Sequence, residues 1–414
     1  MSVENNVPEI RFKGFSGEWM EHNLGELIDI RSAARVHKEQ WTETGVPFFR
    51  TSDVVSIYKG QENAKAFISY DVYKELTGKI GKVSSGDLLV TGGGSIGIPF
   101  LVPNDEPLYF KDADLLWFKN DQKCDGYYLY TFLFSKAFKK YIKSISHIGT
   151  IAHYTIEQAK ATPIKKCERA EQTAIGNTFQ KLDNLIKQHQ QKHDKLSNIK
   201  KAMLEKMFPK QGKTIPEIRF KGFSEEWKTS TLGCLVSFYK GKGLPKSSIQ
   251  YDGIYSCVHY GELFTKYSEV IDLVTSRTNQ SDSFFSMSND VLMPTSDVTP
   301  KGLVKPCCVK QSGVVLGGDI LVIRPNNQNI IDGSFLSRFI RAREQQVLQN
   351  VTGSTVFHLY ASSIEGLGIV FPSIDEQTAI SSYFQKLDAL INQHQQQITK
   401  LNNIKQACLS KMFV

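Results

Sequence analysis

The feature that most constrains this sequence is a 38-residue segment that occurs twice. Residues 171–208 read EQTAIGNTFQKLDNLIKQHQQKHDKLSNIKKAMLEKMF. Residues 376–413, which lie 205 positions later without a gap, read EQTAISSYFQKLDALINQHQQQITKLNNIKQACLSKMF. Neither copy contains proline, and apolar residues recur every three or four positions in both. Each copy is therefore predicted to form one long helix, roughly 50 Å in length at about 1.5 Å per residue.

A second repeat opens each half of the chain. Residues 7–27 read VPEIRFKGFSGEWMEHNLGEL, and residues 215–235, 208 positions later, read IPEIRFKGFSEEWKTSTLGCL. Each half thus contains an opening block, a variable region and a long helix. Because the apolar seam of each helix is narrow, each needs a partner helix, and the other copy is the obvious one. This predicts a pseudo-two-fold molecule in which two antiparallel helices form a coiled-coil spacer between two globular regions.

The two variable regions differ in sequence but share landmarks in the same order. Strand-like runs come first, then an acidic and apolar strand that enters a turn, then a late helix and a Gly-Thr or Gly-Ser segment. The late helices are predicted over 127–144 and 334–349. Short strands with few helices indicate mixed α/β (α+β) domains of roughly 150 residues. The predicted division is a first globular domain 1–170, a helix 171–208, a second globular domain 209–375 that begins with a linker 209–214, and a helix 376–414.

Composition restricts the classes of protein. With 41% hydrophobic and 22% charged residues, the chain is expected to be soluble and globular. It has neither a signal peptide nor an apolar run long enough to cross a bilayer, so a cytoplasmic location without a membrane partner is expected. Seven cysteines without CxxC or His-paired spacing indicate reduced thiols and no metal site. The long helices carry seven of the eight net positive charges, which either attract a phosphate backbone or keep exposed helices soluble.

Motifs for catalysis and for cofactor binding are missing. The sequence has no [DN]-P-P-[FY] or HExxH motif and no complete phosphate loop, so no catalytic residue is assigned. GGGSIG (92–97) formally matches G-x-G-x-x-G, but Ile98 and Pro99 continue an extended run where a dinucleotide site requires a helix. A tight loop that approaches another backbone closely, with DNA as one candidate, is the preferred interpretation. His153 and His358 follow equivalent Gly-Thr and Gly-Ser segments and are interpreted as structural or DNA-contacting.

Side chains suited to contact DNA lie in and near the predicted loops. In the first region the candidates are Arg50, Thr51, Ser52, Gly93, Gly94, Ser95, Thr150 and His153. In the second region they are His259, Tyr260, Arg277, Thr295, Ser296, Lys301, Thr355 and His358. The first late helix places four lysines on one face, at Lys136, Lys139, Lys140 and Lys143. The second late helix offers Arg338, Arg341 and Arg343. Such faces hold phosphates, and simple solvation of the helix is the alternative.

The duplicated EIRFKGF opening, the duplicated EQTAI…FQKLD…QHQQ…KMF helices and the paired GDLLV and NDVLM strands together resemble a type I restriction-modification specificity subunit. The resemblance spans residues 7–413. It implies that the variable regions are target-recognition domains for double-stranded DNA and that the helices dock two methyltransferase subunits, through which restriction subunits join. It also implies that S-adenosylmethionine, ATP and Mg²⁺ belong to those partner subunits and that this chain holds no cofactor and no catalytic site.

The residues add a mechanism to this resemblance. A spacer of roughly 50 Å separates half-sites by about 10–15 base pairs, and two different variable regions predict an asymmetric, bipartite target. Apolar helix residues beyond the seam are predicted to bind the methyltransferase: Ile199, Met203, Leu204 and Phe208. Two alternatives stay open at this point. One is a DNA methyltransferase or nuclease with an unrecognised site, and the other is a coiled-coil assembly protein whose end domains bind other proteins.

Overall fold

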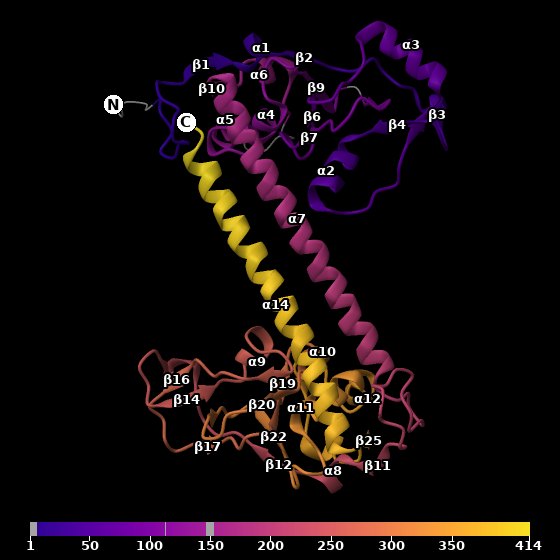
Figure 1. The fold of residues 1–414 in the computed structure, drawn as a ribbon, viewed down its shortest axis with the longest axis vertical. Helices are drawn as coiled ribbons and strands as arrows, with labels where there is room; N and C mark the ends of the chain where they lie inside the picture. Colours follow the sequence, from indigo (N-terminus) through magenta and orange to yellow (C-terminus); the bar gives the residue numbers. More distant parts are fainter. Residues whose placement is uncertain (1–5, 112, 146–152) are drawn as a thin grey trace. The chain divides into compact units, whose positions relative to one another are not determined.

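The computed structural model describes residues 6–111, 113–145 and 153–414. The chain divides into two compact units. Unit 1 comprises Met1–His189 and Gln396–Val414, and unit 2 comprises Gln190–Gln395. Two long helices, α7 (Arg169–Lys206) and α14 (Ile374–Lys411), contribute residues to both units (Figure 1).

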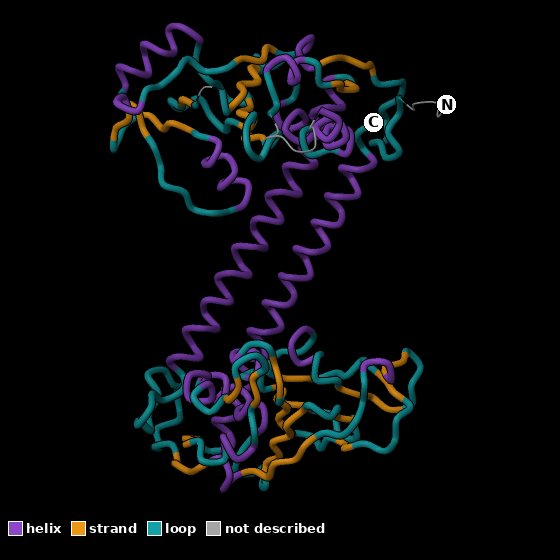
Figure 2. The backbone as a smooth tube through the Cα atoms, turned by 180° about the vertical axis from the view of Figure 1, so that it is seen from behind, coloured by secondary structure: helices purple, strands orange, loops and turns teal. Residues whose placement is uncertain are grey.

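The two predicted long helices are present, and each is continuous over 38 residues (Figure 2). Each begins two residues before the repeated segment and ends two residues before its last residue. Met207 and Phe208 therefore leave the end of α7, and Pro209 follows them. A proline disfavours the helical region for the residue before it, but α14 ends at the equivalent residue, Lys411, without a proline.

Within each unit the segments of α7 and α14 are antiparallel. In unit 1, Asp183 of α7 pairs with Lys405 of α14 at 2.5 Å, and the ring of Phe179 lies 6.2 Å from that of Phe413. An earlier residue of α7 therefore meets a later residue near the end of α14. In unit 2 the equivalent contacts, 205 positions away, are Asp388 with Lys200 at 2.7 Å and Phe384 with Phe208 at 6.3 Å. The same ion pair and the same ring contact thus occur in both units.

The described residues of unit 1 form three small sheets together with short helices, which is the mixed α/β character that was predicted. Their strand orders are β1-β10, β2-β9-β6-β7 and β3-β5-β4-β8. The strands are β1 (Met20–Asn23), β2 (Asp29–Arg31), β3 (Trp41–Thr42), β4 (Val46–Phe49), β5 (Phe67–Ile68), β6 (Leu88–Thr91), β7 (Pro99–Leu101), β8 (Tyr109–Phe110), β9 (Leu115–Lys119) and β10 (Pro163–Lys166). The shorter helices are α1 (Leu24–Leu27), α2 (Thr51–Lys59), α3 (Tyr70–Ile80), α4 (Gly126–Phe132), α5 (Lys136–Ile145) and α6 (Ile156–Lys160), with a 3₁₀ turn η1 (Lys38–Gln40).

Unit 2 repeats this plan with additional strands. Its sheets have the orders β11-β25, β12-β22-β18-β20-β15, β13-β16-β14-β21-β17 and β19-β24-β23. The strands are β11 (Lys228–Thr231), β12 (Val236–Lys240), β13 (Ile249–Gln250), β14 (Tyr255–Val258), β15 (Val270–Ile271), β16 (Arg277–Thr278), β17 (Phe284–Phe285), β18 (Asp290–Pro294), β19 (Ser296–Asp297), β20 (Cys307–Val309), β21 (Val315–Leu316), β22 (Ile320–Pro325), β23 (Thr352–Gly353), β24 (Phe357–His358) and β25 (Gly368–Phe371). The shorter helices are α8 (Leu232–Leu235), α9 (Glu262–Thr265), α10 (Pro300–Leu303), α11 (Gly333–Ala342), α12 (Glu344–Leu348) and α13 (Ala361–Ile364), with a 3₁₀ turn η2 (Lys246–Ser248).

Each late helix that the sequence predicted is in fact two helices. In unit 1 the break falls after α4, where Leu133 ends the helix and the hydroxyl of Ser135 accepts a hydrogen bond from Phe138 N. Ser135 therefore caps the start of α5, and Ser is one of the residues that favour such positions. In unit 2 the break falls at Arg343, whose backbone (φ −99°, ψ 22°) leaves the helical region between α11 and α12.

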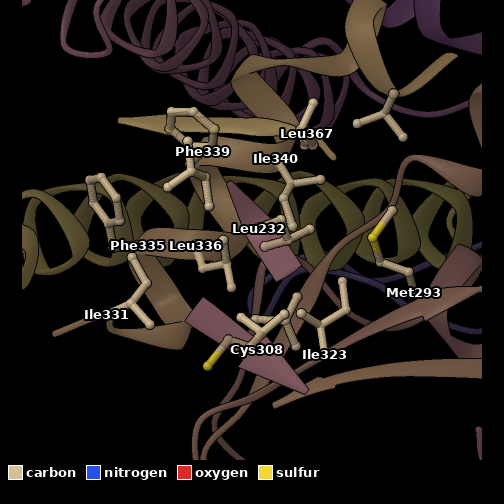
Figure 3. Packing of buried hydrophobic residues seen from close by; sticks show 14 of the residues in the cluster. Leu232, Met293, Cys308, Ile323, Ile331, Phe335, Leu336, Phe339, Ile340 and Leu367 are labelled. Carbon is tan, nitrogen blue, oxygen red and sulfur yellow. The ribbon is translucent and has the colours of Figure 1, made fainter. Parts of the chain in front are cut away.

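The main core of each unit contains one aromatic residue from the far end of a long helix. In unit 2 the rings of Trp227, Phe335 and Phe384 surround Phe208. Figure 3 shows the aliphatic side of this core, where Phe335 and Phe339 of α11 lie with Leu232, Ile323 and other apolar side chains.

Unit 1 has the equivalent aromatic arrangement. There the rings of Trp19, Tyr128 and Phe179 surround Phe413. Helix α7 begins in unit 1, and the residues after its end join the core of unit 2. Helix α14 begins in unit 2, and the residues after its end join the core of unit 1.

The opening block is fixed to the start of a long helix by a buried ion pair in both units. Arg11 donates from Nε and Nη2 to the two carboxylate oxygens of Glu171, each at 2.7 Å. Arg219 does the same to Glu376, also at 2.7 Å for each bond. Both glutamates are 1% exposed. In each unit the arginine of the repeated EIRF motif therefore pairs with the glutamate of the repeated EQT motif.

Candidate nucleic-acid interface

Three segments that carry the predicted DNA contacts come together in unit 1. The loop after β6 forms an isolated bridge between Gly93 and His153. Gly92 N donates to Asp114 O at 2.8 Å, and Thr51 Oγ1 donates to the same carbonyl at 3.2 Å. Residues 50–52, 92–98 and 153 are therefore neighbours, and we call them the loop cluster of unit 1.

The glycines of this cluster serve a close backbone approach, as the sequence predicted, but the backbone that approaches belongs to the same unit. A Cβ atom on Gly92 would lie 2.9 Å from Tyr154 O, so no larger residue fits without movement. Tyr154 N in turn donates to Gly92 O at 2.8 Å. Burial of Tyr154, whose hydroxyl is hydrogen-bonded to Thr162, raises the pKa of that phenol and keeps it neutral. Gly93 is buried by this packing, which corrects its assignment to DNA contact, whereas Gly94 and Ser95 are exposed.

The four predicted lysines lie beside this cluster. α5 packs on the unit through Phe138, which is 2% exposed, and a Cβ atom on Gly97 would meet the Phe138 ring at 3.0 Å. The glycine loop and α5 are therefore in contact. All four lysines of α5 are exposed at the surface: Lys136, Lys139, Lys140 and Lys143. Their ammonium groups and the exposed tip of the loop offer a basic surface suited to phosphates.

Three other predicted residues of unit 1 need separate comment. Arg50 is the N-cap residue directly before α2, and its guanidinium donates to both carboxylate oxygens of Asp53 and to Ala64 O. The hydrogen bond with Asp53 raises the pKa of Arg50, and the pair uses most of its donors inside the unit. Its assignment to DNA contact stays a prediction. Ser52 is exposed on the same turn. Thr150 lies outside the described residues.

The equivalent three segments come together in unit 2. Ser296 of β19 pairs with His358 of β24, and Ser296 Oγ lies 3.3 Å from His358 Nδ1. Thr295 N donates to Asp319 O at 3.0 Å, just as Gly92 N donates to Asp114 O in unit 1. These positions match those of Gly93 and His153, at offsets of 203 and 205 residues. We call residues 259–260, 295–301 and 355–360 the loop cluster of unit 2.

His259 and Tyr260 join this cluster through a short turn. Gly317 N donates to Val258 O at 3.0 Å, and the same turn contains Asp319, which bonds Thr295. His259 is held by its own neighbours, because its N–H donates to Glu262 and its Nδ1 accepts from Gly261 N. Lys301 and Thr355 are exposed in the same cluster. Arg277 is exposed on β16, in the neighbouring sheet.

The arginines of the second late helix do not form the predicted phosphate-binding face. Arg338 is 1% exposed and pairs with Asp388 at 3.2 Å, and burial lowers the pKa of its guanidinium. This corrects its assignment, because a buried arginine paired across to α14 does not reach DNA. Arg341 is half-buried and donates to Val304 O at 2.7 Å, and Arg343 donates to Pro209 O. The three guanidinium groups of this segment are therefore engaged in contacts inside unit 2.

The predicted partner-binding residues also pack inside unit 2. Phe208 is 2% exposed at the centre of the core, which excludes it from a free docking surface. Ile199, Met203 and Leu204 are partly buried against the same core. The helical periodicity identified these residues as apolar but did not show which unit covers them.

Sequence reasoning missed an apolar rim around the loop cluster of unit 2. Val298 is 72% exposed, Val356 is 43% exposed and Tyr360 is 53% exposed. The Tyr360 ring lies 6.0 Å from that of His358 in a stacked geometry. The sequence feature that could have indicated this rim is the presence of apolar side chains and a tyrosine inside otherwise polar loops. Apolar side chains in such loops can contact the methyl group of thymine.

Metal sites, membrane-spanning helices and disulfides were also considered among the described residues. The described residues contain no group of three or more His, Cys, Asp or Glu side chains that could hold a metal ion. Among the described helices none is long and apolar enough to span a membrane. All seven cysteines are free thiols.

Comparison with known proteins decides which family this arrangement belongs to. Residues 16–198 and 224–403 each match the type I restriction modification DNA specificity domain, so the matched segments cover most of the chain and fall one in each half. The chain belongs to the type I restriction-modification DNA specificity family. Its two repeats are therefore two copies of the specificity domain within one chain.

Individual members of the specificity family resemble the chain over nearly its whole length. The type I restriction enzyme MjaIX specificity subunit of Methanocaldococcus jannaschii is 22% identical over 426 aligned positions, which cover 94% of this chain and 90% of that protein. The crystal structure of the type I restriction-modification S subunit from M. genitalium superposes with a TM-score of 0.66 at 16% identity, over 99% of both chains. A structure from work on assembly and conformational transition of the type I R-M system gives a TM-score of 0.50 at 15% identity, covering 94% and 96%. The two solved structures share the fold with this specificity-family chain.

Proposed function

We propose that this chain is the non-catalytic DNA-recognition subunit of a cytoplasmic type I restriction-modification complex. It reads an asymmetric, bipartite target with two recognition domains (1–170 and 209–375) and holds two methyltransferase subunits, through which restriction subunits join. S-adenosylmethionine, ATP and Mg²⁺ belong to those partners. The observation that carries the proposal is the recurrence of one three-segment loop cluster in both units with different side chains.

The differences between the two loop clusters support an asymmetric target. In this part of the cluster unit 1 presents Gly94 and Ser95, whereas unit 2 presents Ser296, Lys301 and an apolar rim. Base edges are distinguished by their pattern of donors, acceptors and methyl groups, so surfaces that differ in this way select different bases. A palindromic target would require equivalent side chains in both clusters.

Substituting the four exposed lysines of α5 by glutamine tests the DNA-binding surface. The salt dependence of DNA binding, measured as the slope of log K against log salt, is expected to become shallower by about 1 for each lysine that contacts a phosphate. The methylated sequence stays the same because phosphate contacts do not read bases. The charge-matched control replaces four other exposed lysines of unit 1 (Lys65, Lys74, Lys79 and Lys82). Equal slopes for both quadruple variants would contradict the assigned surface.

The corrected partner surface uses exposed apolar residues that recur in both long helices. Leu185 of α7 is 43% exposed and Leu390 of α14, 205 positions later, is 44% exposed. An equivalent leucine left exposed in each unit fits a partner that binds twice. Leu185→Asp and Leu390→Asp are each expected to remove one of two methyltransferase subunits, as counted by native mass spectrometry of the purified complex. Leu273→Asp is the control, because Leu273 is 70% exposed and lies on neither long helix. Retention of both subunits in the double variant would refute this surface.

A further inference from the structure

The four-stranded sheet of unit 1 ends in the edge strand β7. The equivalent strand of unit 2, β20, is not an edge, because a further strand pairs with it. Leu101 of β7 pairs with Leu88 of β6, and the equivalent pair in unit 2 is Cys308 of β20 with Val291 of β18. In unit 2 a further strand, β15, adds to β20 in parallel, with Val270 opposite Cys308. The sheet of unit 1 has the order β2-β9-β6-β7, so no described strand takes the place of β15.

Strand β15 is held by its backbone and by the acidic residue just before it. Cys308 N donates to Glu269 O at 2.9 Å, and Lys310 N donates to Ile271 O at 3.1 Å. The Glu269 carboxylate pairs with Lys200 of α7 at 2.8 Å. Unit 2 therefore shows what this edge accepts: one carboxylate followed by two β-branched apolar residues.

The corresponding groups of unit 1 are present without this occupant. Val102 N donates to Asp87 O at 2.9 Å, so the backbone of the preceding residue, Leu101, faces the outer side of β7. Outside its ladder with β6, where it lies opposite Leu88, Leu101 N has no backbone partner among the described residues. Lys405, the counterpart of Lys200, pairs with Asp183 but with no second carboxylate of the described chain.

A groove of about 770 Å³ lies along this edge, entirely within unit 1. β7 forms one side, and a row of aromatic rings forms much of the rest. The Tyr58 ring of α2, itself 56% exposed, stacks 5.8 Å from Phe134 at an interplanar angle of 13°. The row continues to Tyr130 at 5.1 Å and from there to Tyr127 at 5.3 Å. Burial raises the pKa of Tyr130 to about 12, so its hydroxyl stays neutral.

The charge of the groove favours an acidic occupant. Lys139, Lys187 and Lys405 line it. The two carboxylates in its wall are already used: Asp125 accepts from Tyr128 N at the start of α4, and Asp183 accepts from Tyr127 and Lys405. Extended peptides that add to a sheet edge gain affinity from backbone hydrogen bonds and specificity from alternate side chains.

We propose that this groove binds an extended segment of a protein partner, which adds to β7 as a short parallel strand. The segment carries a carboxylate that pairs with Lys405, followed by two β-branched apolar residues. Pro99 and Pro103 lack an N–H on either side of Leu101, so the ladder is limited to Leu101. The same prolines protect the edge against longer pairing between chains. This site uses none of the residues of the loop clusters and shares one side chain, Lys139, with the lysine face of α5. The peptide binding that it predicts does not depend on DNA recognition.

The aromatic row explains why the two units differ here. In α11 of unit 2 the positions equivalent to Tyr127 and Tyr130 are Ser334 and Ser337, and Ser337 Oγ donates to Glu269 O at 2.9 Å. Small residues leave room for a strand that is permanently part of the unit. Rings at the same positions offer an apolar wall to a segment that arrives from another protein.

The probe that tests this proposal is a fluorescein-labelled peptide with the sequence of residues 266–273, KYSEVIDL, which contains β15. It is titrated against the full chain, and anisotropy is measured. Binding is expected, and Tyr58→Ala is expected to weaken it about tenfold through loss of ring contact. Tyr70→Ala is the matched control, because Tyr70 is 57% exposed on α3 and does not line the groove. A peptide with glutamine in place of its glutamate is expected to bind about tenfold more weakly.

Three results would overturn the proposal. One is the absence of peptide binding up to about 1 mM, the affinity of a contact worth only about 4 kcal/mol. Another is an equal effect of Tyr58→Ala and Tyr70→Ala, which would place the peptide elsewhere. The third is binding of a single-stranded oligonucleotide that is lost in Tyr58→Ala while the peptide does not bind, which would make the groove a base-stacking site.

Discussion

The Phe208→Ala variant is expected to lower the free energy of unfolding of unit 2 by about 3–5 kcal/mol, the usual cost of truncating a buried phenylalanine. The Phe208 ring lies 5.5 Å from that of Phe335, 6.1 Å from Phe339 and 6.2 Å from Trp227. Because Phe335 and Phe339 are fixed on α11 and Trp227 lies directly before β11, the cavity cannot close without moving more than one segment. The loss falls on unit 2, although α7 begins in unit 1.

Native-state hydrogen exchange measures this effect separately for each unit, since a two-unit chain has no single unfolding free energy. Phe208→Ala should reduce amide protection in β18, β22 and α11. Phe413→Ala, the equivalent change, should reduce it in β6, β9 and α4. Ile404→Ala is the control, because Ile404 is 39% exposed and surface changes usually stay within about 0.5 kcal/mol. Equal deprotection of both units by either phenylalanine variant would contradict this account of the two cores.

The Arg219→Met variant is expected to cost a similar amount, about 3–5 kcal/mol, because it leaves the buried carboxylate of Glu376 without its partner. Glu376 is 1% exposed, and Arg219 provides two charged hydrogen bonds to it at 2.7 Å. Burying a charge without compensation is far more costly than losing the attraction of the pair itself. The charge-free double variant, Arg219→Met with Glu376→Leu, is therefore expected to recover most of the lost stability.

The mutant cycle consists of Arg219→Met, Glu376→Leu and the double variant. The stability of each is measured by denaturation, with amide protection in unit 2 as the readout. The Arg11 and Glu171 pair of unit 1 provides an internal replicate of the same contact. Additive losses in the double variant would show that the two side chains act independently. That result would exclude the ion pair as the contact that fixes the opening block to the helix.

The parts of the fold that follow from repetition and periodicity were predictable. The offset of 205 residues identified two long helices, and the second repeat at 208 residues identified two copies of one plan. The paired GDLLV and NDVLM strands correctly marked β6 and β18. The equivalence of His153 and His358, inferred from their place after a glycine, became a contact with Gly93 in one unit and with Ser296 in the other.

What failed depended on tertiary contacts that a linear pattern does not contain. Phe208 and Arg338 have the sequence context of an exposed helix face, but both are buried in unit 2. Periodicity assigns residues to a face of a helix without showing what covers that face. The break at Ser135 was missed for a related reason, because a serine inside a helical pattern caps a helix only when the chain turns there.

The most direct test of the central claim is to co-express this chain with a type I methyltransferase subunit and to map methylated bases by single-molecule sequencing of the host DNA. The account predicts methylation at one gapped motif whose two halves differ. Changing Ser296 and His358 should alter one half of that motif and leave the other half unchanged. A palindromic motif, or no methylation despite a stable complex that also fails to bind DNA, would contradict the account.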